Sequence, residues 1–263
     1  MTCWKAWESA VPELTTIDFW DSYWSTLTLP RTIDPSFSFD RCLSEAFTDV
    51  LAGRSGDSLE IGCAPGAWMA FMADLGFCPS GIEYSQVGLA ATEKNLSLLG
   101  VPFGELIAAD FLALPSEPRF DVVMSLGFIE HFEEPMPVIE RHVGWLKPGG
   151  LLVLGVPNFR GLHGAVQRFV GPEVLAKHNR AVMTPAFFED LQGPLGLTLH
   201  DVRYLGGFEP ALPMFDADVG GLRRLFGRVL IGVASRLRRI RAFDDMNGPR
   251  ISSYLLATFE KAR

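Results

Sequence analysis

The stretch LEIGCAPG at residues 59–66 decides the fold of this chain. Residues 58–63 are predicted to form a buried strand, and a helix is predicted to follow over residues 66–75. The turn between them contains only small residues and a proline, so the backbone can approach a ligand closely. The helix N-terminus beyond it favours a negative group. The sequence therefore predicts a strand–turn–helix unit that binds a ligand.

The pattern of alternating elements extends this unit into a sheet. Further strands are expected at residues 80–84, near residue 109, and at 120–125, 151–156, 197–205 and 251–260. Helices are expected at residues 40–52, 87–99, 137–146 and, from Thr184, after the fifth strand. Strands that alternate with helices indicate right-handed crossovers and a mostly parallel sheet covered on both faces. The predicted class is therefore a doubly wound α/β fold.

The same turn separates two candidate cofactors. Dinucleotide sites have the pattern G-x-G-x-x-G, whereas this turn has Gly62, Ala64 and Gly66 as G-x-A-x-G. Glu60 precedes it, and its charge would repel a pyrophosphate but suits the cationic amino group of a methionine moiety. The turn thus favours S-adenosylmethionine over a dinucleotide, and an NAD-dependent oxidoreductase is disfavoured.

Acidic residues close the next two strands. Glu83, followed by Tyr84, lies where a carboxylate can accept hydrogen bonds from both ribose hydroxyls. Asp110 lies where it can accept from an adenine amino group while the ring of Phe111 covers the adenine face. Both pairs favour an adenosine moiety.

Five motifs in order resemble those of the class I S-adenosylmethionine-dependent methyltransferase superfamily. They are LEIGCAPG (59–66), GIEYS (81–85), AADF (108–111), FDVVMSLGFIEH (120–131) and LKPGGLLVLGVPN (146–158). The resemblance covers about residues 57–158, with Ala64 where many members have glycine. It implies a Rossmann-like, seven-stranded sheet whose last strand, residues 251–260, is antiparallel, and it implies S-adenosylmethionine as cofactor. Candidate cofactor residues are Glu60, Gly62, Ala64, Gly66, Trp68, Glu83, Tyr84, Asp110, Phe111 and Ser125.

His131 is the first candidate for a general base. It follows Glu130 just after the fourth strand, and the carboxyl ends of such strands face the ligand crevice. The Glu-His pair is similar to that of ubiquinone-pathway O-methyltransferases, whose E-x-x-E-H pattern is linked to a metal. Here Gly127 occupies the first position, so no metal is expected. Packing beside the cofactor without chemistry is the alternative for His131.

Two segments are expected to complete the site. The methyltransferase domain is assigned to residues 57–263, with an acceptor-binding insertion at about 158–183 that is loosely similar to those of glycan- or secondary-metabolite-tailoring members. Its His163 and His178 are further candidate bases, or polar residues of surface helices. Residues 1–56, rich in aromatic side chains, are expected to fold over the site as a cap that excludes water, or to pack on the sheet.

Composition limits the partners. The net charge of −8 argues against nucleic acid, and four cysteines without a C-x-x-C pair fit a reducing cytoplasm. No apolar run is long enough to span a membrane. One amphipathic helix with seven arginines is predicted at about residues 221–243. Its apolar positions are expected to pack on the body with the arginines in solvent; the alternatives are an anionic membrane, a partner or an acidic substrate. Peripheral membrane contact is not favoured because the rest of the chain is acidic, and a homo-oligomer stays open.

The predicted function is methylation of a small molecule, with a hydroxyl of a sugar, glycan or secondary metabolite as the first choice. The alternatives are N-methylation of a metabolite or aminosugar amine, and a non-catalytic subunit that binds S-adenosylmethionine. A hydroxyl needs a base during attack, whereas an amine only needs to be neutral.

Overall fold

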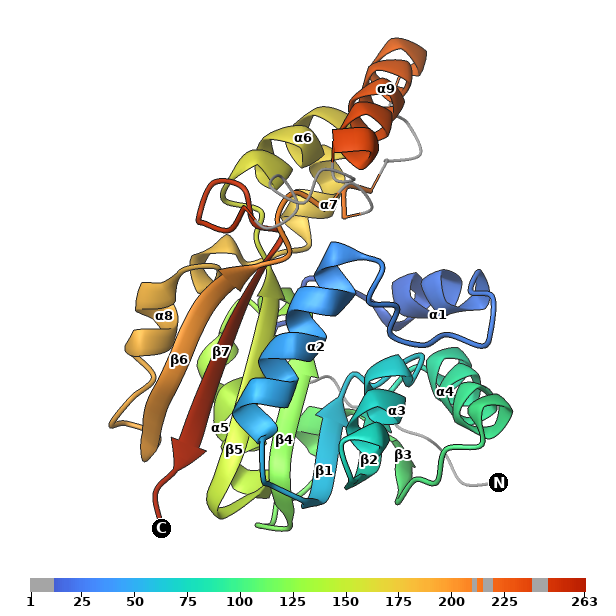
Figure 1. Ribbon diagram of the computed structural model, residues 1–263. Coiled ribbons are helices and arrows are strands. Elements are labelled where there is room, and N and C mark those ends of the chain that lie inside the picture. Colours follow the sequence, from blue (N-terminus) through green and yellow to red (C-terminus); the bar gives the residue numbers. More distant parts are fainter. Residues whose placement is uncertain (1–11, 210–211, 215–219, 238–245) are drawn as a thin grey trace.

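The protein forms one seven-stranded sheet flanked by helices (Figure 1). The computed structural model describes residues 12–209, 212–214, 220–237 and 246–263. Across the sheet the strands run in the order β3-β2-β1-β4-β5-β7-β6. Their bounds are β1 Gly56–Ile61, β2 Phe77–Glu83, β3 Leu106–Ala108, β4 Phe120–Leu126, β5 Leu146–Pro157, β6 Leu197–Leu205 and β7 Tyr254–Lys261.

The strand directions follow the expected topology. β7 pairs antiparallel with both β5 and β6, while β1 to β5 pair parallel with one another. The chain order reverses between β1 and β4, which leaves a crevice at the carboxyl ends of these two strands. The predicted doubly wound fold with an antiparallel last strand is confirmed.

Helices cover both faces of the sheet (Figure 1). Alternate residues of β4 point to opposite faces: Val122 and Met124 join a core with α2 and α3, whereas Val123 joins a core with α5 and α8. This two-sided burial is why β4 is apolar almost throughout. The helices are α1 Ile17–Ser25, α2 Ser38–Leu51, α3 Ala67–Asp74, α4 Gln86–Leu99, α5 Pro135–Trp145, α6 Leu162–Val170, α7 Pro172–Ala176, α8 Pro185–Glu189 and α9 Gly221–Leu237, with short 3-10 turns η1 Phe111–Ala113, η2 Ile129–His131 and η3 Arg180–Val182.

Local sequence signals set most element bounds. Thr184 accepts the Phe187 N–H and caps α8, with Pro185 at the first helical position, as predicted. β6 has the bounds predicted for it, but β7 begins three residues later than expected. The N–H groups of Ile251 and Ser252 both donate to the Gly248 carbonyl, so a turn takes up the start of that segment.

The arginine-rich helix is present, but its predicted packing is wrong. α9 forms over the described part of the predicted range, and residues 238–243 lie outside the described residues. Its apolar side chains are exposed, with Leu222 82%, Leu225 61% and Val229 57% accessible, while the buried position is Gly227. The helix therefore contacts α6 through Phe226 and the face of Gly227, and it leaves most of its apolar side chains in solvent. None of the described helices is both long and apolar enough to cross a bilayer.

Candidate active site

The turn after β1 brings the backbone to the crevice. Gly62 and Gly66 have φ angles of 72° and 83°, the left-handed region that favours glycine. A Cβ on Gly62 would lie 3.0 Å from the Phe128 ring, and one on Gly66 would lie 2.9 Å from Cγ2 of Thr92. Both glycines are therefore required by conformation and by space. Without side chains at these positions, the backbone of the turn is open to the close approach of a ligand that the sequence predicts.

Glu60 places a buried carboxyl group at this turn. Its side chain is buried in β1, and its Oε2 has no hydrogen-bond partner among the described residues. Burial, reinforced by the charge of Glu83, raises the pKa of Glu60 well above its ordinary value. A carboxylate oxygen without a donor in the interior is unfavourable unless a cation meets it. The amino group of S-adenosylmethionine fits this need.

Glu83 ends β2 beside Glu60. Its Oε1 accepts the Ser85 backbone N–H at 2.9 Å, and burial raises its pKa to about 7. Ser85 in turn donates its hydroxyl to Asp21 of α1 at 2.5 Å. The carboxylate retains acceptor capacity, and its role toward ribose hydroxyls stays a prediction. Tyr84 follows it, and burial together with Glu13 raises the pKa of this phenol.

The residues proposed for the adenine are partly engaged in local structure. The Asp110 carboxylate accepts the Leu112 N–H at 2.9 Å and caps η1. The Phe111 ring is buried 4.8 Å from the His142 ring, and Ser125 lies 3.0 Å from Nε2 of His142. These contacts place Phe111 and Ser125 in one buried layer beside the strand ends. Their roles toward adenine stay predictions.

Trp68 lies on a different face from the other candidates. Its ring stacks on Phe47 of α2 with centroids 5.5 Å apart, and it meets the edge of Phe71. It belongs to the core between α2, α3 and the sheet. These contacts favour a packing role for Trp68 over the predicted contact with cofactor.

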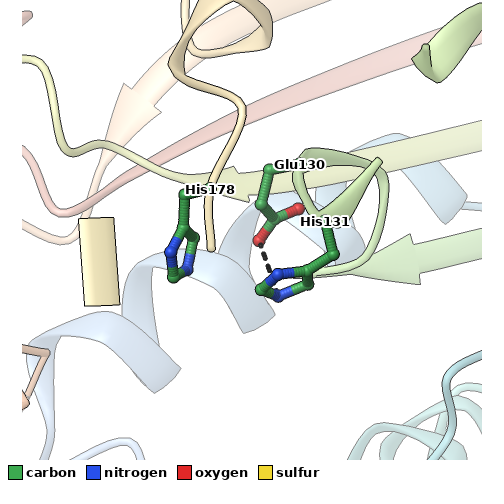
Figure 2. A group of neighbouring side chains, drawn as sticks. All are labelled: Glu130, His131 and His178. Carbon is green, nitrogen blue, oxygen red and sulfur yellow. Dashed lines mark ion pairs between the residues drawn. The ribbon is translucent and has the colours of Figure 1, made fainter. Parts of the chain in front are cut away.

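Three titratable side chains meet beyond the carboxyl end of β4. Glu130 and His131 come from η2, and His178 comes from the segment after α7 (Figure 2). The two imidazole centroids are 4.7 Å apart, and Nε2 of His131 lies 3.8 Å from Oε1 of Glu130. Each residue offers one oxygen or nitrogen atom within 4.8 Å of the others. The structure thus joins two of the three predicted bases.

The hydrogen bonds assign the tautomers of both histidines. Nδ1 of His131 faces the Lys177 carbonyl at 2.8 Å, and Nδ1 of His178 faces the Val174 carbonyl at 2.6 Å. Since a carbonyl only accepts, both Nδ1 atoms carry the proton and both Nε2 atoms keep a lone pair. Burial lowers the pKa of His131 to about 3, helped by His178, and it lowers that of His178 as well. Both rings are therefore neutral at physiological pH.

The carboxyl group of this cluster is neutral too. Burial raises the pKa of Glu130 to about 8, and its Oε2 has no hydrogen-bond partner among the described residues. The two imidazole lone pairs can accept a proton from a hydroxyl, and the same three side chains could hold a divalent cation if Glu130 lost its proton. The sequence expectation of no metal depended on Gly127. The tertiary structure supplies a third potential ligand in His178.

His178 also borders an open cavity of about 840 Å³. Arg160 and Arg180 line the same cavity, together with Asn179 and the apolar side chains of Leu14 and Leu175. The Nδ2 group of Asn179 donates to the carbonyls of two residues, Phe132 and Glu133, which ties the cavity wall to η2. The two arginines did not emerge as site residues from the sequence, because their approach to His178 depends on how the 158–183 segment folds back.

The N-terminal segment lies against the same cluster. The Leu14 N–H donates to the His131 carbonyl at 2.7 Å, and the Trp20 ring meets the His131 ring edge-on at 5.2 Å. Nζ of Lys177 lies 4.1 Å from the centre of the Phe19 ring. Helix α1 therefore contacts both η2 and the segment after α7, near the bond between Asp21 and Ser85.

His163 has a different environment from the other two histidines. It is buried in α6, where its Nε2 accepts the Glu209 backbone N–H at 2.9 Å. Its ring stacks on Phe208 with centroids 4.5 Å apart. A ring nitrogen that binds a main-chain N–H is not available to a substrate, so these contacts favour a structural role. The catalytic assignment of His163 stays a prediction.

Comparisons with known proteins agree with this arrangement. Residues 59–154 match the family model described as a methyltransferase domain. The chain is 31% identical over 128 residues to a ubiquinone biosynthesis O-methyltransferase of Paraburkholderia phytofirmans, covering 48% of this chain and 54% of that protein. It is 29% identical over 165 residues to the protein of the same name from Paraburkholderia phymatum, covering 62% of this chain and 66% of that protein. The matches thus span about half to two thirds of these relatives.

Solved structures share the fold at low identity. A methyltransferase from Archaeoglobus fulgidus, described as S-adenosylmethionine dependent, superposes with a TM-score of 0.53 and 16% identity, covering 84% of this chain and 94% of that one. The [4+2]-cyclase SpnF superposes with a TM-score of 0.61 and 18% identity, covering 96% and 98%. At such identities the likeness concerns the fold alone, and the cyclase illustrates that the fold does not determine the reaction.

The fold and site define a class of protein. The strand order with β7 antiparallel, the glycine turn after β1 and the acid that ends β2 agree with the fold of class I S-adenosylmethionine-dependent methyltransferases. Residues 59–154 form the methyltransferase domain of this chain, and S-adenosylmethionine is its cofactor class. Glu60, Glu83 and the turn fit that cofactor by charge and by space.

Proposed function

We propose that this protein transfers a methyl group from S-adenosylmethionine to a hydroxyl group of a small molecule. When bound, the cofactor supplies a methyl group on a positively charged sulfur. The observation that carries the proposal is the pair of neutral imidazoles, His131 and His178, at the end of β4 beside the cavity. The relatives named O-methyltransferases support a hydroxyl acceptor.

The chain's own groups handle the acceptor proton. As the acceptor oxygen forms its bond to the methyl carbon, the carbon–sulfur bond breaks and the hydroxyl proton moves to a Nε2 lone pair. His178 borders the cavity, and His131 lies behind it against Glu130. We assign proton acceptance to this pair. His131, which belongs to η2, also positions His178 beside the cavity. The products are a methyl ether, the demethylated cofactor and a protonated imidazole that releases its proton to solvent.

The cavity wall indicates the chemistry of the acceptor. Arg160 and Arg180 both line it, and no acidic side chain except Glu133 does so among the described residues. Guanidinium groups bind carboxylates and phosphates. We infer that the acceptor is a small hydroxylated molecule with an anionic group. Residues 158–183, which supply both arginines and His178, serve as the acceptor-binding insertion.

The N-terminal segment serves as a cap in this proposal. The contacts of Trp20 with His131 and of Asp21 with Ser85 connect α1 to both the acceptor side and the cofactor side. An apolar cover excludes water from a displacement reaction. We extend this role to residues 1–56, although residues 1–11 lie outside the described residues. The free thiols Cys42, Cys63 and Cys78 support a reducing cytoplasm as the compartment.

A labelled-donor screen tests the function. The purified protein is incubated with S-adenosylmethionine carrying a trideuteromethyl group and with hydroxylated acids, their amine analogues and their phosphate esters, and products are measured by mass spectrometry. We expect transfer to oxygen. Transfer to the amine analogues alone would replace the proposal by N-methylation. Tight binding of S-adenosylhomocysteine without any transfer would support the non-catalytic alternative.

A further inference from the structure

Helix α9 presents an apolar stripe that the rest of the fold does not use. Leu222, Leu225, Val229 and Val233 recur at intervals of three or four residues, with Phe226 and Leu237 alongside, and all six are between 42% and 82% exposed. Residues at this spacing share one face of a helix. The exposed apolar side chains therefore form one continuous face.

The opposite face attaches α9 to the protein. Gly227 is buried, and Ile231 and Ala234 are half-buried at the same helical spacing. Phe226 also meets Phe169 of α6 edge-on at 5.3 Å, and the Arg223 guanidinium lies over that ring. Figure 1 shows α9 at the outer end of α6, away from the sheet. The helix is anchored mainly through Gly227, Ile231 and Phe226, while Leu222, Leu225 and Val229 face outward.

The charged residues of α9 itself have one sign. α9 contains Arg223, Arg224, Arg228 and Arg236 and no acidic residue, and residues 238–241 add three more arginines in the sequence. An amphipathic helix with arginines beside an apolar face binds the interface of an anionic bilayer, because the apolar side chains enter the acyl boundary while the guanidinium groups meet lipid phosphates.

We propose that α9 docks this protein on the surface of an anionic lipid bilayer. A second copy of the chain is a poorer occupant, since pairing two such helices would gather their arginines without an acid of α9 to pair them. The acidic charge on the rest of the chain does not prevent docking, because charges beyond about 8 Å are largely screened at about 0.15 M salt. Figure 1 shows α9 at a distance from the sheet, so the acidic residues of the sheet side are far from a bilayer bound by α9.

Docking through α9 has a consequence for the cavity. α9 contacts α6, α6 contacts α7, and Leu175 and Ala176 of α7 line the cavity beside His178. A bilayer bound by α9 would therefore be connected, through α6 and α7, to the wall of the acceptor cavity. This proposal does not depend on the reaction, since it concerns only where the protein resides.

Vesicle flotation tests the proposal with the full chain. We expect the protein to float with phosphatidylcholine vesicles that contain phosphatidylglycerol, to stay unbound with phosphatidylcholine alone, and to lose binding at high salt. The double variant Leu225→Glu, Val229→Glu and the charge reversal of Arg223, Arg224 and Arg228 should each lower the bound fraction roughly tenfold or more. Arginine-to-lysine changes at the same three positions should keep most of it.

The control and the contrary outcomes are separate measurements. Leu98→Glu changes an exposed leucine on α4, away from α9, and should leave flotation unchanged. Circular dichroism and the Tm verify that each variant folds. Absence of flotation, equal binding to neutral vesicles, or full binding by the Leu225→Glu, Val229→Glu variant would overturn the proposal. The proposal would also be overturned if the native chain were a dimer without lipid and the Leu225→Glu, Val229→Glu variant were a monomer. The stripe would then be a self-association surface.

Discussion

His131 and His178 place their imidazole rings 4.7 Å apart, and each directs Nδ1 to a main-chain carbonyl. This relationship leaves an Nε2 lone pair on each ring, and Nε2 of His131 lies 3.8 Å from Oε1 of Glu130. It gives one site two histidines of fixed tautomer from distant parts of the chain. The first predictions concern this pair.

Loss of either imidazole should slow methyl transfer. We expect His131→Ala and His178→Ala each to lower kcat roughly a hundredfold, because general-base catalysis contributes on that order. Affinity for S-adenosylhomocysteine should change little. His200→Ala, on the exposed side of β6, is the matched control. Near-normal turnover in both variants would return the pair to a packing role.

Chelation distinguishes proton acceptance from metal binding at the cluster. Burial raises the pKa of Glu130 to about 8, so at neutral pH it is protonated and a poor metal ligand. We therefore expect turnover to persist after treatment with EDTA and gel filtration. Loss of activity that Mg²⁺ or Zn²⁺ restores would show that Glu130, His131 and His178 hold a cation.

The cofactor assignment rests first on Glu83. Glu83→Ala removes a carboxylate placed to accept charge-assisted hydrogen bonds from the ribose. We expect affinity for S-adenosylhomocysteine to fall at least roughly tenfold, since such bonds are worth about 1.5–3 kcal/mol. Calorimetry measures this, with Glu93→Ala on the exposed side of α4 as control. Unchanged affinity in a folded Glu83 variant would remove this residue from the site.

Stability should depend on pH through the same carboxyl group. Burial raises the pKa of Glu83 from 4.5 to about 7 in the folded protein, which corresponds to about 3 kcal/mol. A raised acid pKa means that stability is complete below pH about 4.5 and is lost as the pH rises through about 7. Without cofactor, Glu83→Gln should thus gain stability relative to the native chain over this window. Chemical denaturation at several pH values measures the difference, and a constant difference would contradict the prediction.

Removal of the aromatic cover should affect catalysis through the cap. Trp20→Ala deletes the ring that meets His131 at 5.2 Å and opens α1 to water. We expect kcat to fall about tenfold or more, as is usual when a positioned site loosens. Ile17→Ala, at an exposed position of α1, should have little effect. Equal kinetics in the two variants would make α1 ordinary packing.

Much of the fold follows from local signals in the sequence. The small residues of the 59–66 turn, the apolar run of β4 and the capped start of α8 each depend on neighbours in the chain. Glu60, Glu83 and Asp110 were predictable for the same reason, since an acid at the end of a parallel strand lies at the crevice whatever the rest of the chain does. These features needed no knowledge of long-range contacts.

Other features depend on contacts between distant segments. Trp68 lies two residues after Gly66, yet its ring packs on Phe47 of α2. His178 reaches His131 only because the segment after α7 folds back onto η2 through Asn179. Helical periodicity identified the apolar stripe of α9, but not which face meets α6. By itself the sequence determined the α/β fold, the glycine turn and the acids at the strand ends, because these depend on residues a few positions apart. The tertiary structure alone decided the partners of His131 and the exposure of α9, because side-chain burial is settled by packing between elements.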